Sequence, residues 1–254
     1  MSNYIFLQAR INSRRFPKKV LKKIFDKTII ELIVERLNKI KNIKKIVLVT
    51  GPENKNSDLI VEVQKLNLDY FCGSEENILD RFYQASKMFN PDNIIRVTAD
   101  CPLIDFNLVN KGLKIFSKEN YDILSVDRVK TYPHGVNFQI FSNNALEKAW
   151  LEIKNQFKDN TLFLRSFIPP ISFMLEDPQF RKYDLINKID NSHIRIVLDY
   201  PEDFELIKKI YESLYEKNRF FDLSDVLKFL KNNQHLLEIN KKYVDLTHGY
   251  KFKK

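Results

Sequence analysis

The chain has 254 residues, of which 44% are apolar and 30% are charged, and its formal net charge is +9. This length and apolar content are enough to bury a full core, which excludes a disordered polypeptide. No apolar run approaches the roughly 20 residues that span a bilayer, and the start, MSNYIFLQAR, has no basic region followed by a secretory apolar stretch. We therefore expect a cytoplasmic globular protein with no membrane partner.

Two cysteines, Cys72 and Cys101, are the only ones in the sequence. No CxxC pair or Cys/His cluster accompanies them, so we expect neither a disulfide framework nor a zinc site. The lysines are spread along the chain and interleaved with Asp and Glu, which favours solvated helix faces over a nucleic-acid stripe. We expect no nucleic-acid partner.

The most distinctive stretch is QARINSRRFPKKVL, from Gln8 to Leu21, which follows a short apolar run at Tyr4 to Leu7. It holds five cations: Arg10, Arg14, Arg15, Lys18 and Lys19. Ligands of open α/β sheets lie outside the carboxyl ends of the strands, so a cationic loop after the first strand favours a polyphosphate site. Pro17 and Ser13 indicate a shaped loop. The alternative is a solvated basic loop.

The segments that follow alternate between strand and helix patterns. Residues 29–37 carry apolar positions at helical spacing behind Thr28, a good N-cap, and Ser57 is expected to cap a second helix over 57–66. Residues 46–50 and 69–72 read as strands, the first ended by Gly51 and Pro52. This alternation predicts a mostly parallel, Rossmann-like sheet flanked by helices with right-handed crossovers.

A helix entrance and a strand end supply further candidate site residues. Ser74 can cap a helix whose first turn holds Glu76 or Asn77. Residues 93–100 predict a buried strand that ends in Asp100, a candidate ligand for a hard cation that bridges phosphates. Asp105 is better suited to cap the next helix.

The second half of the chain continues the α/β pattern. Strands are predicted over 121–126, 136–140 and 194–198, and a helix over 144–154 carries Trp150, a packing or subunit-contact residue. Taken alone, Asp199 is a plausible cap before a helix that starts at Pro201. A lone loop histidine such as His134 is more often a hydrogen-bonding group than a general base.

The Gln8 to Leu21 stretch resembles the amino-terminal signature of the cytidylyltransferase family, which includes CMP-KDO synthetases, acylneuraminate cytidylyltransferases and the spore-coat polysaccharide type. The last type usually reads QAR-x-GS-T-RLPGK-x-L. The positions that match are Gln8, Ala9, Arg10, Ser13, Arg15, Pro17, Lys19 and Leu21. Asn12 and Lys18 replace two glycines, Arg14 a threonine and Phe16 a leucine.

The resemblance extends along nearly the whole chain. RVTADCPLID, over 96–105, is the most specific match, and GSEENILDR and LDYPEDFEL are similar to family segments at 73–81 and 198–206. Where the spore-coat type reads close to YPRG-x-D-x-E-x-F, this chain has Asn137 and Gln139 in place of the two acids. An Asp-Arg-Glu-His type motif common in the family is not recognisable in DNTLFLRSFI, over 159–168.

What the resemblance implies is a single nucleotidyltransferase domain of GT-A-like fold over 1–254. Residues of about 130–190 would bind the acceptor and form a dimer contact, and 222–254 would form a carboxyl-terminal helix and tail. The implied activity is transfer of CMP from CTP to an acidic sugar, with release of pyrophosphate, in surface glycan or polysaccharide biosynthesis. The family also implies Mg²⁺ as cofactor and a homodimer.

The resemblance also implies roles for single residues. Catalytic roles fall on Arg10, Lys19 and Asp100, and metal ligation on Asp100 and Asp199. Nucleotide binding falls on Ala9, Arg10, Ser13, Arg15, Lys19, Gly73, Ser74, Asp80, Arg81, Thr98 and Ala99. Acceptor binding falls on Tyr132, His134, Asn137, Gln139 and Arg165. On structure alone, Asp80 and Arg81 would be a surface pair. Amides at 137 and 139 remove two charges, which leaves open a phosphorylated acceptor.

Two alternatives from other classes stay open. A GT-A-type glycosyltransferase would bind metal through Asp-x-Asp, but Asp100-Cys101-Pro102 has no second acid at that position. A non-catalytic nucleotide-binding module would bind CTP without releasing pyrophosphate, and the loss of two loop glycines allows it.

Overall fold

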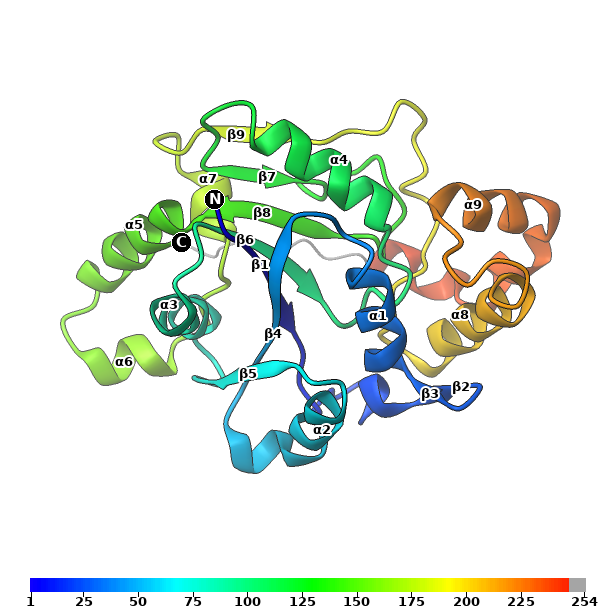
Figure 1. The fold of residues 1–254 in the computed structure, drawn as a ribbon, viewed down its shortest axis with the longest axis horizontal. Helices are drawn as coiled ribbons and strands as arrows, with labels where there is room; N and C mark the ends of the chain where they lie inside the picture. Colours follow the sequence, from blue (N-terminus) through cyan, green and yellow to red (C-terminus); the bar gives the residue numbers. More distant parts are fainter. Residues whose placement is uncertain (247–254) are drawn as a thin grey trace.

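The computed structural model describes residues 1–246. Its centre is a seven-stranded sheet in the order β5-β4-β1-β6-β8-β7-β9 (Figure 1). These strands are β1 (Asn3–Gln8), β4 (Ile43–Thr50), β5 (Asp69–Cys72), β6 (Asn93–Thr98), β7 (Ile123–Ser125), β8 (Phe138–Ser142) and β9 (Lys182–Asp184). Neighbouring strands are parallel except around β8, which runs antiparallel to β6 and β7. The predicted mostly parallel α/β sheet is confirmed.

Helices cover both faces of the sheet (Figure 1). One apolar cluster packs α1 (Ile29–Leu37), α2 (Glu53–Lys65), α4 (Phe106–Phe116), α8 (Pro201–Leu214) and α9 (Leu223–Asn232) on the face that carries Ile5 and Leu7. The other packs α3 (Ile78–Phe89), α5 (Asn143–Asn155), α6 (Asn160–Arg165) and α7 (Ser172–Glu176) on the face that carries Tyr4 and Phe6. Successive residues of a strand point to opposite faces, so both faces of β1 are apolar.

Short elements complete the described chain. A two-stranded hairpin of β2 (Lys23–Ile24) and β3 (Lys27–Thr28) follows the 3-10 helix η1 (Lys19–Leu21). Two further 3-10 helices, η2 (Gln234–Ile239) and η3 (Lys241–Leu246), follow α9. The predicted carboxyl-terminal helix is α9, which Asp222 caps. The tail expected to run to 254 lies partly outside the described residues.

Several helix starts match the sequence analysis and two differ. Thr28, Asp105 and Ser142 each cap a helix through a side-chain oxygen, as Thr28 and Asp105 were expected to do. The cap predicted at Ser74 is wrong, because Asn77 caps α3. Ser74 Oγ instead accepts from the Asn77 amide at 3.0 Å, one step before the helix.

Helix α2 begins four residues before the predicted cap at Ser57. Its first turn is bent at Asn56, which has a non-helical φ of −130°. Asn56 is buried, and its side chain accepts from the Ile11 amide at 3.0 Å and donates to the Pro52 carbonyl at 2.9 Å. This residue therefore ties the loop after β1 to the loop after β4.

The strand predicted over 194–198 is wrong, since the segment passes as an extended chain between two loops. It forms an isolated bridge between Arg195 and His134, and further along the Leu198 amide donates to the Asp100 carbonyl at 2.7 Å. Gly135 permits the close approach. Its φ is +127°, and a Cβ there would lie 2.4 Å from the Ile196 carbonyl carbon.

The segment of about 130–190 supplies β8 and β9 to the main sheet, and α5, α6 and α7 to one of its faces. Trp150 of α5 is buried there and stacks on Tyr83 of α3, with ring centroids 4.0 Å apart. Its packing role is thereby confirmed.

Candidate functional site

The loops that carry the predicted site residues meet at one edge of the sheet. Strands β1, β4, β5 and β6 all end at this edge, and the loop before the antiparallel β8 reaches it from the other side. The sheet topology therefore brings together residues from 9–19, 51–52, 73–77, 98–105 and 132–137. Figure 1 shows the edge at the end of the β1, β4 and β6 arrows.

Two cations of the loop after β1 contact one carboxylate, that of Asp199. Lys19 Nζ lies 2.9 Å from Asp199 Oδ1 and donates to the Leu198 carbonyl at 2.6 Å, and Arg15 Nη2 lies 2.8 Å from the same Oδ1. The Lys19 and Asp199 side chains are only 11% and 13% exposed. Burial raises the pKa of Asp199, but Lys19 and Arg15 outweigh it and hold the pKa below its usual value.

A buried ion pair holds Asp199 in place. Asp203, in the first turn of α8, is fully buried and makes a bidentate pair with Arg195 at 2.9 and 2.7 Å. The same carboxylate accepts from the backbone amides of Asp199 and Tyr200 at 2.9 and 3.0 Å. Asn240 adds a hydrogen bond to Asp203 at 2.8 Å. The backbone at Asp199 is therefore fixed from both sides.

Sequence reasoning missed Arg195 and Asp203. A signal for the first was present, because an arginine interrupts the apolar run at 194–198 and a charge in such a run needs a buried partner. The partner lies eight residues away, on the first turn of the next helix.

Asp100, the first metal candidate, lies beside the Asp199 segment. Its carboxylate accepts from Thr98 Oγ1 and from Cys101 Sγ, the latter at 3.5 Å. The Leu198 amide donates to its carbonyl, so the backbones of the two acidic positions are joined one residue from Asp199. Within residues 1–246, no group of three or more His, Cys, Asp or Glu could hold a metal ion. A pair of carboxylates still suits Mg²⁺, which takes its remaining ligands from phosphate and water.

His134 lies between these groups. Arg195 Nη1 lies 3.3 Å from its Nδ1, and both Asp100 and Asp199 act on it electrostatically. Burial is the main cause that lowers the pKa of His134, and Arg195 adds to it. Because arginine can only donate, Nδ1 is the acceptor and Nε2 carries the proton of the neutral ring.

A second group lies at the ends of β4 and β5. The Gly73 amide donates to the Thr50 carbonyl at 3.1 Å, and a Cβ on Gly73 would lie 2.9 Å from Arg81 Cγ. Arg10 Nη1 lies 3.5 Å from Glu75 Oε1. Ser74 Oγ donates to the Leu164 carbonyl at 3.0 Å. The predicted nucleotide-binding residues Arg10, Gly73 and Arg81 are thus neighbours.

Three further predicted nucleotide-binding residues, Ala9, Ser13 and Ala99, belong to the loops that follow β1 and β6. Ala9 and Ala99 are buried, and the Ala99 amide donates to the Gln8 carbonyl at 2.9 Å, which joins the ends of β1 and β6. The Ser13 amide donates to the Ile11 carbonyl at 2.9 Å and so closes a tight turn within the cationic loop.

Asp80 is separate from this group. It is buried between α3 and α5, where its carboxylate accepts from Trp150 Nε1 at 2.9 Å and from Gln84 at 3.2 Å. Arg81 is also buried, at 2% exposure. The alternative in which Asp80 and Arg81 form a surface pair is wrong, and Asp80 is a core residue because α3 turns it toward α5.

Besides His134, two of the predicted acceptor residues, Gln139 and Tyr132, are engaged within the protein. Gln139 is buried and bridges Arg96, at 2.7 Å, and Asp127, at 2.9 Å. An amide suits this position because it accepts from the cation and donates to the anion. Tyr132 is buried in the core, with its hydroxyl 3.5 Å from the Ile186 carbonyl.

The other two predicted acceptor residues are Asn137, in the loop before β8, and Arg165, at the end of α6. The Asn137 backbone hydrogen bonds to Cys101, next to Asp100. Arg165 is exposed at the end of α6, directly after Leu164, whose carbonyl Ser74 contacts.

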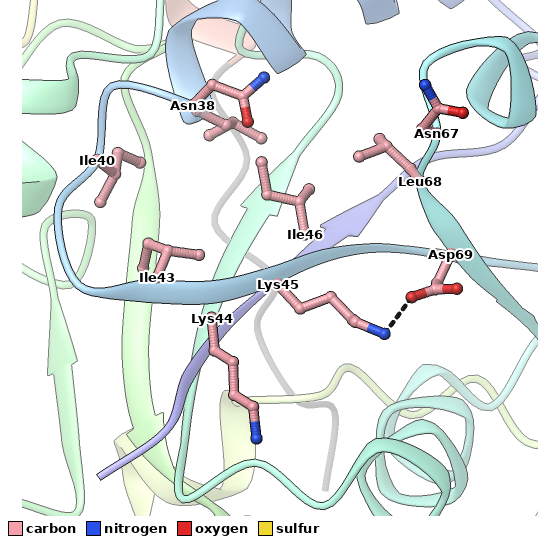
Figure 2. A pocket seen from close by; sticks show the side chains of 10 residues that line it. Asn38, Ile40, Ile43, Lys44, Lys45, Ile46, Asn67, Leu68 and Asp69 are labelled. Carbon is pink, nitrogen blue, oxygen red and sulfur yellow. Dashed lines mark ion pairs between the residues drawn. The ribbon is translucent and has the colours of Figure 1, made fainter.

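A pocket of about 340 Å³ lies at the opposite edge of the sheet, where β4 and β5 begin. Figure 2 shows Ile40, Ile43 and Ile46 around it, and the ion pair of Lys45 with Asp69 on β5. Lys45 Nζ lies 2.5 Å from Asp69 Oδ2. None of the predicted site residues lines this pocket. We therefore assign the candidate site to the carboxyl edge, where the cations and the two acids meet.

A mostly parallel sheet with a cationic loop and two acidic residues at its carboxyl edge is typical of a nucleotide-binding α/β protein. Comparison with known proteins gives the family. The family model described as cytidylyltransferase matches residues 4–235. The chain belongs to the cytidylyltransferase family and is a CTP-dependent nucleotidyltransferase.

Three similar proteins illustrate the range of this family. An uncharacterized protein of Methanocaldococcus jannaschii, MJ1063, is 30% identical over 92% of each chain. The spore coat polysaccharide biosynthesis protein SpsF of Bacillus subtilis is 26% identical over 85% of this chain and 90% of its own. The structure of a cytidylyltransferase from Leptospira borgpetersenii aligns with a TM-score of 0.83 at 26% identity, over 93% of this chain and 97% of the other. The resemblance found in the sequence is confirmed.

No helix within residues 1–246 is both long and apolar enough to cross a membrane.

Proposed function

We propose that the protein transfers CMP from CTP to an acidic sugar or a phosphorylated acceptor and releases pyrophosphate, as a step in surface glycan or polysaccharide biosynthesis. The observation that carries this proposal is the contact of Lys19 and Arg15 with Asp199, one residue from the backbone bond to Asp100. The cations that we propose to bind phosphate and the carboxylates that we propose to hold Mg²⁺ thus belong to neighbouring segments. The similarity to the Bacillus subtilis protein supports the polysaccharide role.

The cations supply the binding and stabilisation of the triphosphate. Lys19 and Arg15 would exchange the Asp199 carboxylate for phosphate oxygens, and Arg10 would leave Glu75 for the same reason. Held in this way, the β- and γ-phosphates form a stabilised leaving group when an acceptor oxygen attacks the α-phosphorus in line. Removal of such a donor costs on the order of a hundredfold in rate or more.

Asp100 and Asp199 would hold Mg²⁺. The donor set fits this ion because two carboxylates from adjacent segments leave the remaining positions to phosphate and water. When bound, the ion offsets negative charge on the phosphates. Thr98 and Arg195 orient the two segments without taking part in ligation.

In this proposal, His134 and Asn137 face the acceptor. Neutral His134 would donate a hydrogen bond from Nε2, since its Nδ1 is occupied by Arg195. The Asn137 backbone contacts Cys101, the neighbour of Asp100, so an acceptor bound at Asn137 would lie near the proposed Mg²⁺ ligand. The amide at Asn137 leaves the position without charge, which tolerates an anionic acceptor.

The test is a pyrophosphate-release assay with CTP, Mg²⁺ and a panel of acidic sugars and phosphorylated compounds. We expect turnover with at least one acceptor, and loss of on the order of a hundredfold in Lys19→Ala and Asp100→Asn. Lys23→Ala is the matched control, because Lys23 is exposed on the β2 strand outside the site. CTP binding without pyrophosphate release from any acceptor would favour a non-catalytic module.

We also propose a homodimer formed through α5 and α6. These adjacent helices expose Leu151, Leu162 and Leu164 at 46%, 61% and 38%, in the segment expected to form a dimer contact. Exposed large apolar side chains on a helix pair of this kind are often covered by a partner. Light scattering should give twice the chain mass for the wild type and the monomer mass for Leu162→Glu, whereas a wild-type monomer would contradict the proposal.

A further inference from the structure

The 3-10 helix η3 places an aromatic ring against the segment that carries Asp199. Tyr243 of η3 stacks on Tyr200, with ring centroids 3.8 Å apart and an angle of 3° between the ring planes. Tyr200 directly follows Asp199 and is the N-cap residue of α8. A parallel stack this close joins the last described element of the chain to one side of the candidate site.

The Tyr200 ring also lies beside Arg15 of the cationic loop. Arg15 Cζ is 5.2 Å from the centre of the ring, within the range of a cation–π contact. Arg15 therefore contacts both the Asp199 carboxylate, at 2.8 Å, and the ring of the next residue. The ring attracts the charge of the guanidinium as a whole, so this contact can persist when the N–H groups turn from a carboxylate to phosphate oxygens.

The Tyr243 ring is held in place from two further sides. Its hydroxyl donates to Glu202 in the first turn of α8, with both carboxylate oxygens at 3.2 Å. The Tyr243 amide donates to the Asn240 carbonyl at 2.9 Å, and the buried Asn240 side chain donates to the Arg195 carbonyl at 3.1 Å. These bonds make η3 a fixed support for the Tyr200 ring.

The two cations that contact Asp199 differ in how they are held. The Lys19 side chain is 11% exposed and donates to the Leu198 carbonyl at 2.6 Å, so it stays in place without Asp199. The Arg15 side chain is 53% exposed, and the Tyr200 ring keeps it near the site once a triphosphate displaces Asp199. A side chain that is already ordered loses less conformational entropy on binding than one that moves freely in solvent.

We propose that Tyr243 is a positioning residue for nucleotide binding. It supports the Tyr200 ring, and the ring holds Arg15 in the orientation in which it binds the triphosphate of CTP. Tyr243 acts through Tyr200 and need not touch the nucleotide. The inference rests on the proposed function and gives the carboxyl-terminal η3 a part in it.

The test is a double-mutant cycle on the dissociation constant of CTP, measured by calorimetry with Mg²⁺. Tyr243→Ala should weaken CTP binding about threefold to tenfold, the range expected for the contact of one cation with one ring. In an Arg15→Ala background the same substitution should change the affinity by less than about twofold. Arg10→Ala is the matched background, because Arg10 is also half-exposed but pairs with Glu75 and not with the ring. There Tyr243→Ala should have its full effect.

Three further substitutions separate the stack from general stability. Tyr243→Phe keeps the ring and loses only the hydrogen bond to Glu202, so its CTP affinity should stay within about twofold of the wild type. Tyr243→Leu keeps apolar volume without an aromatic face and should weaken binding as Tyr243→Ala does, including where the alanine variant fails to fold. Phe25→Ala is the control, since it removes a ring stacked on Tyr215 in the turn between β2 and β3. Its CTP affinity should equal that of the wild type.

The outcomes separate this inference from the proposed function. A wild type that binds no CTP would overturn the proposed function and this inference with it. If the wild type binds CTP, the positioning role alone is overturned by an equal effect of Tyr243→Ala with and without Arg15. Wild-type affinity in Tyr243→Leu would overturn it as well.

Discussion

Replacement of Asp199 by Asn should have opposite effects on the free protein and on nucleotide binding. In the free protein, Asp199 is the common partner of Lys19 and Arg15, and Arg195 lies 3.7 Å from its other oxygen. Removal of one member of a buried ion pair costs about 3–5 kcal/mol. Because Arg15 remains 53% exposed and can turn to water, we expect a smaller loss, of about 2 kcal/mol. For a chain of this size that lowers Tm by roughly 4–8 °C.

The affinity of Asp199→Asn for nucleotide, in contrast to its stability, should be higher than that of the wild type when no metal is present. In the wild type, a triphosphate must displace the Asp199 carboxylate from two cations and then lie beside its negative charge. Two like charges about 4 Å apart repel by roughly 4 kcal/mol in a medium of intermediate dielectric constant. Even a third of that energy is about tenfold in affinity. Asp199→Asn should therefore bind CTP in EDTA on the order of tenfold more tightly than the wild type.

Calorimetric titration of CTP into both proteins, in EDTA and then in Mg²⁺, tests this reasoning. With Mg²⁺ the wild type should gain affinity and Asp199→Asn should gain little, because one of the two proposed ligands is gone. Equal or weaker binding of CTP by Asp199→Asn in EDTA would refute the reasoning, since it would mean that the carboxylate does not compete for the cations.

Three further substitutions test the loop and the surrounding framework. Lys18→Gly should raise the free energy of unfolding by about 0.5–1 kcal/mol in urea denaturation, because Lys18 has a φ of 55° and glycine adopts this conformation without strain. Glu35→Gln should destabilise the protein by about 1–3 kcal/mol at pH 7, since Glu35 accepts from Arg219 at 2.5 Å. Burial raises the pKa of Glu35, but hydrogen bonds led by that from Arg219 hold it below 4.5, so this stabilisation is present above about pH 4.5 and lost as pH falls through the lower, folded-state pKa. Thermal denaturation of the wild type and Glu35→Gln should be measured at steps of about one pH unit between pH 3 and 7. The difference in Tm between the two proteins should become smaller toward acid pH. Asn240→Ala should cost about 1–3 kcal/mol in the same urea assay, because it leaves the buried Asp203 without one donor.

The periodicity of the sequence was enough to predict the architecture. Strands such as β5, expected over 69–72, are marked by apolar and aromatic runs between turn residues, and α1 by apolar positions at helical spacing. The segment 194–198 has the same apolar pattern but pairs with no strand, and its backbone makes two hydrogen bonds to His134 and one to Asp100. Whether an extended segment finds a neighbouring strand depends on tertiary structure, which no local pattern contains.

Lys18 shows how much of the loop conformation survives a change of sequence. The family pattern has a glycine here, and the backbone keeps the left-handed conformation that glycine favours although the residue is lysine. The loop is fixed by bonds on both sides, among them the Lys18 amide to the Ile11 carbonyl at 3.2 Å and Asn56 to the Ile11 amide. Because these contacts determine the conformation, the lost glycine does not abolish the shape.

The membership of the candidate site was only partly predictable. The ends of the strands before Gln8 and Asp100 could be read from the sequence, and they placed Lys19 and Asp100 at one edge, whereas Asp199 was assigned to it by the family resemblance. The direction in which a helical side chain points could not be read from the sequence. Asp80 was expected near the nucleotide, but it lies in the core.

We propose above that Lys19 and Arg15 of the cationic loop exchange Asp199 for the triphosphate of CTP. A crystal structure of the protein with CTP and Mg²⁺ tests it most directly. We expect phosphate oxygens on Lys19 and Arg15, with Asp199 released from both cations. Bound nucleotide at another place, or at this edge with the Lys19 and Arg15 contacts to Asp199 intact, would contradict it.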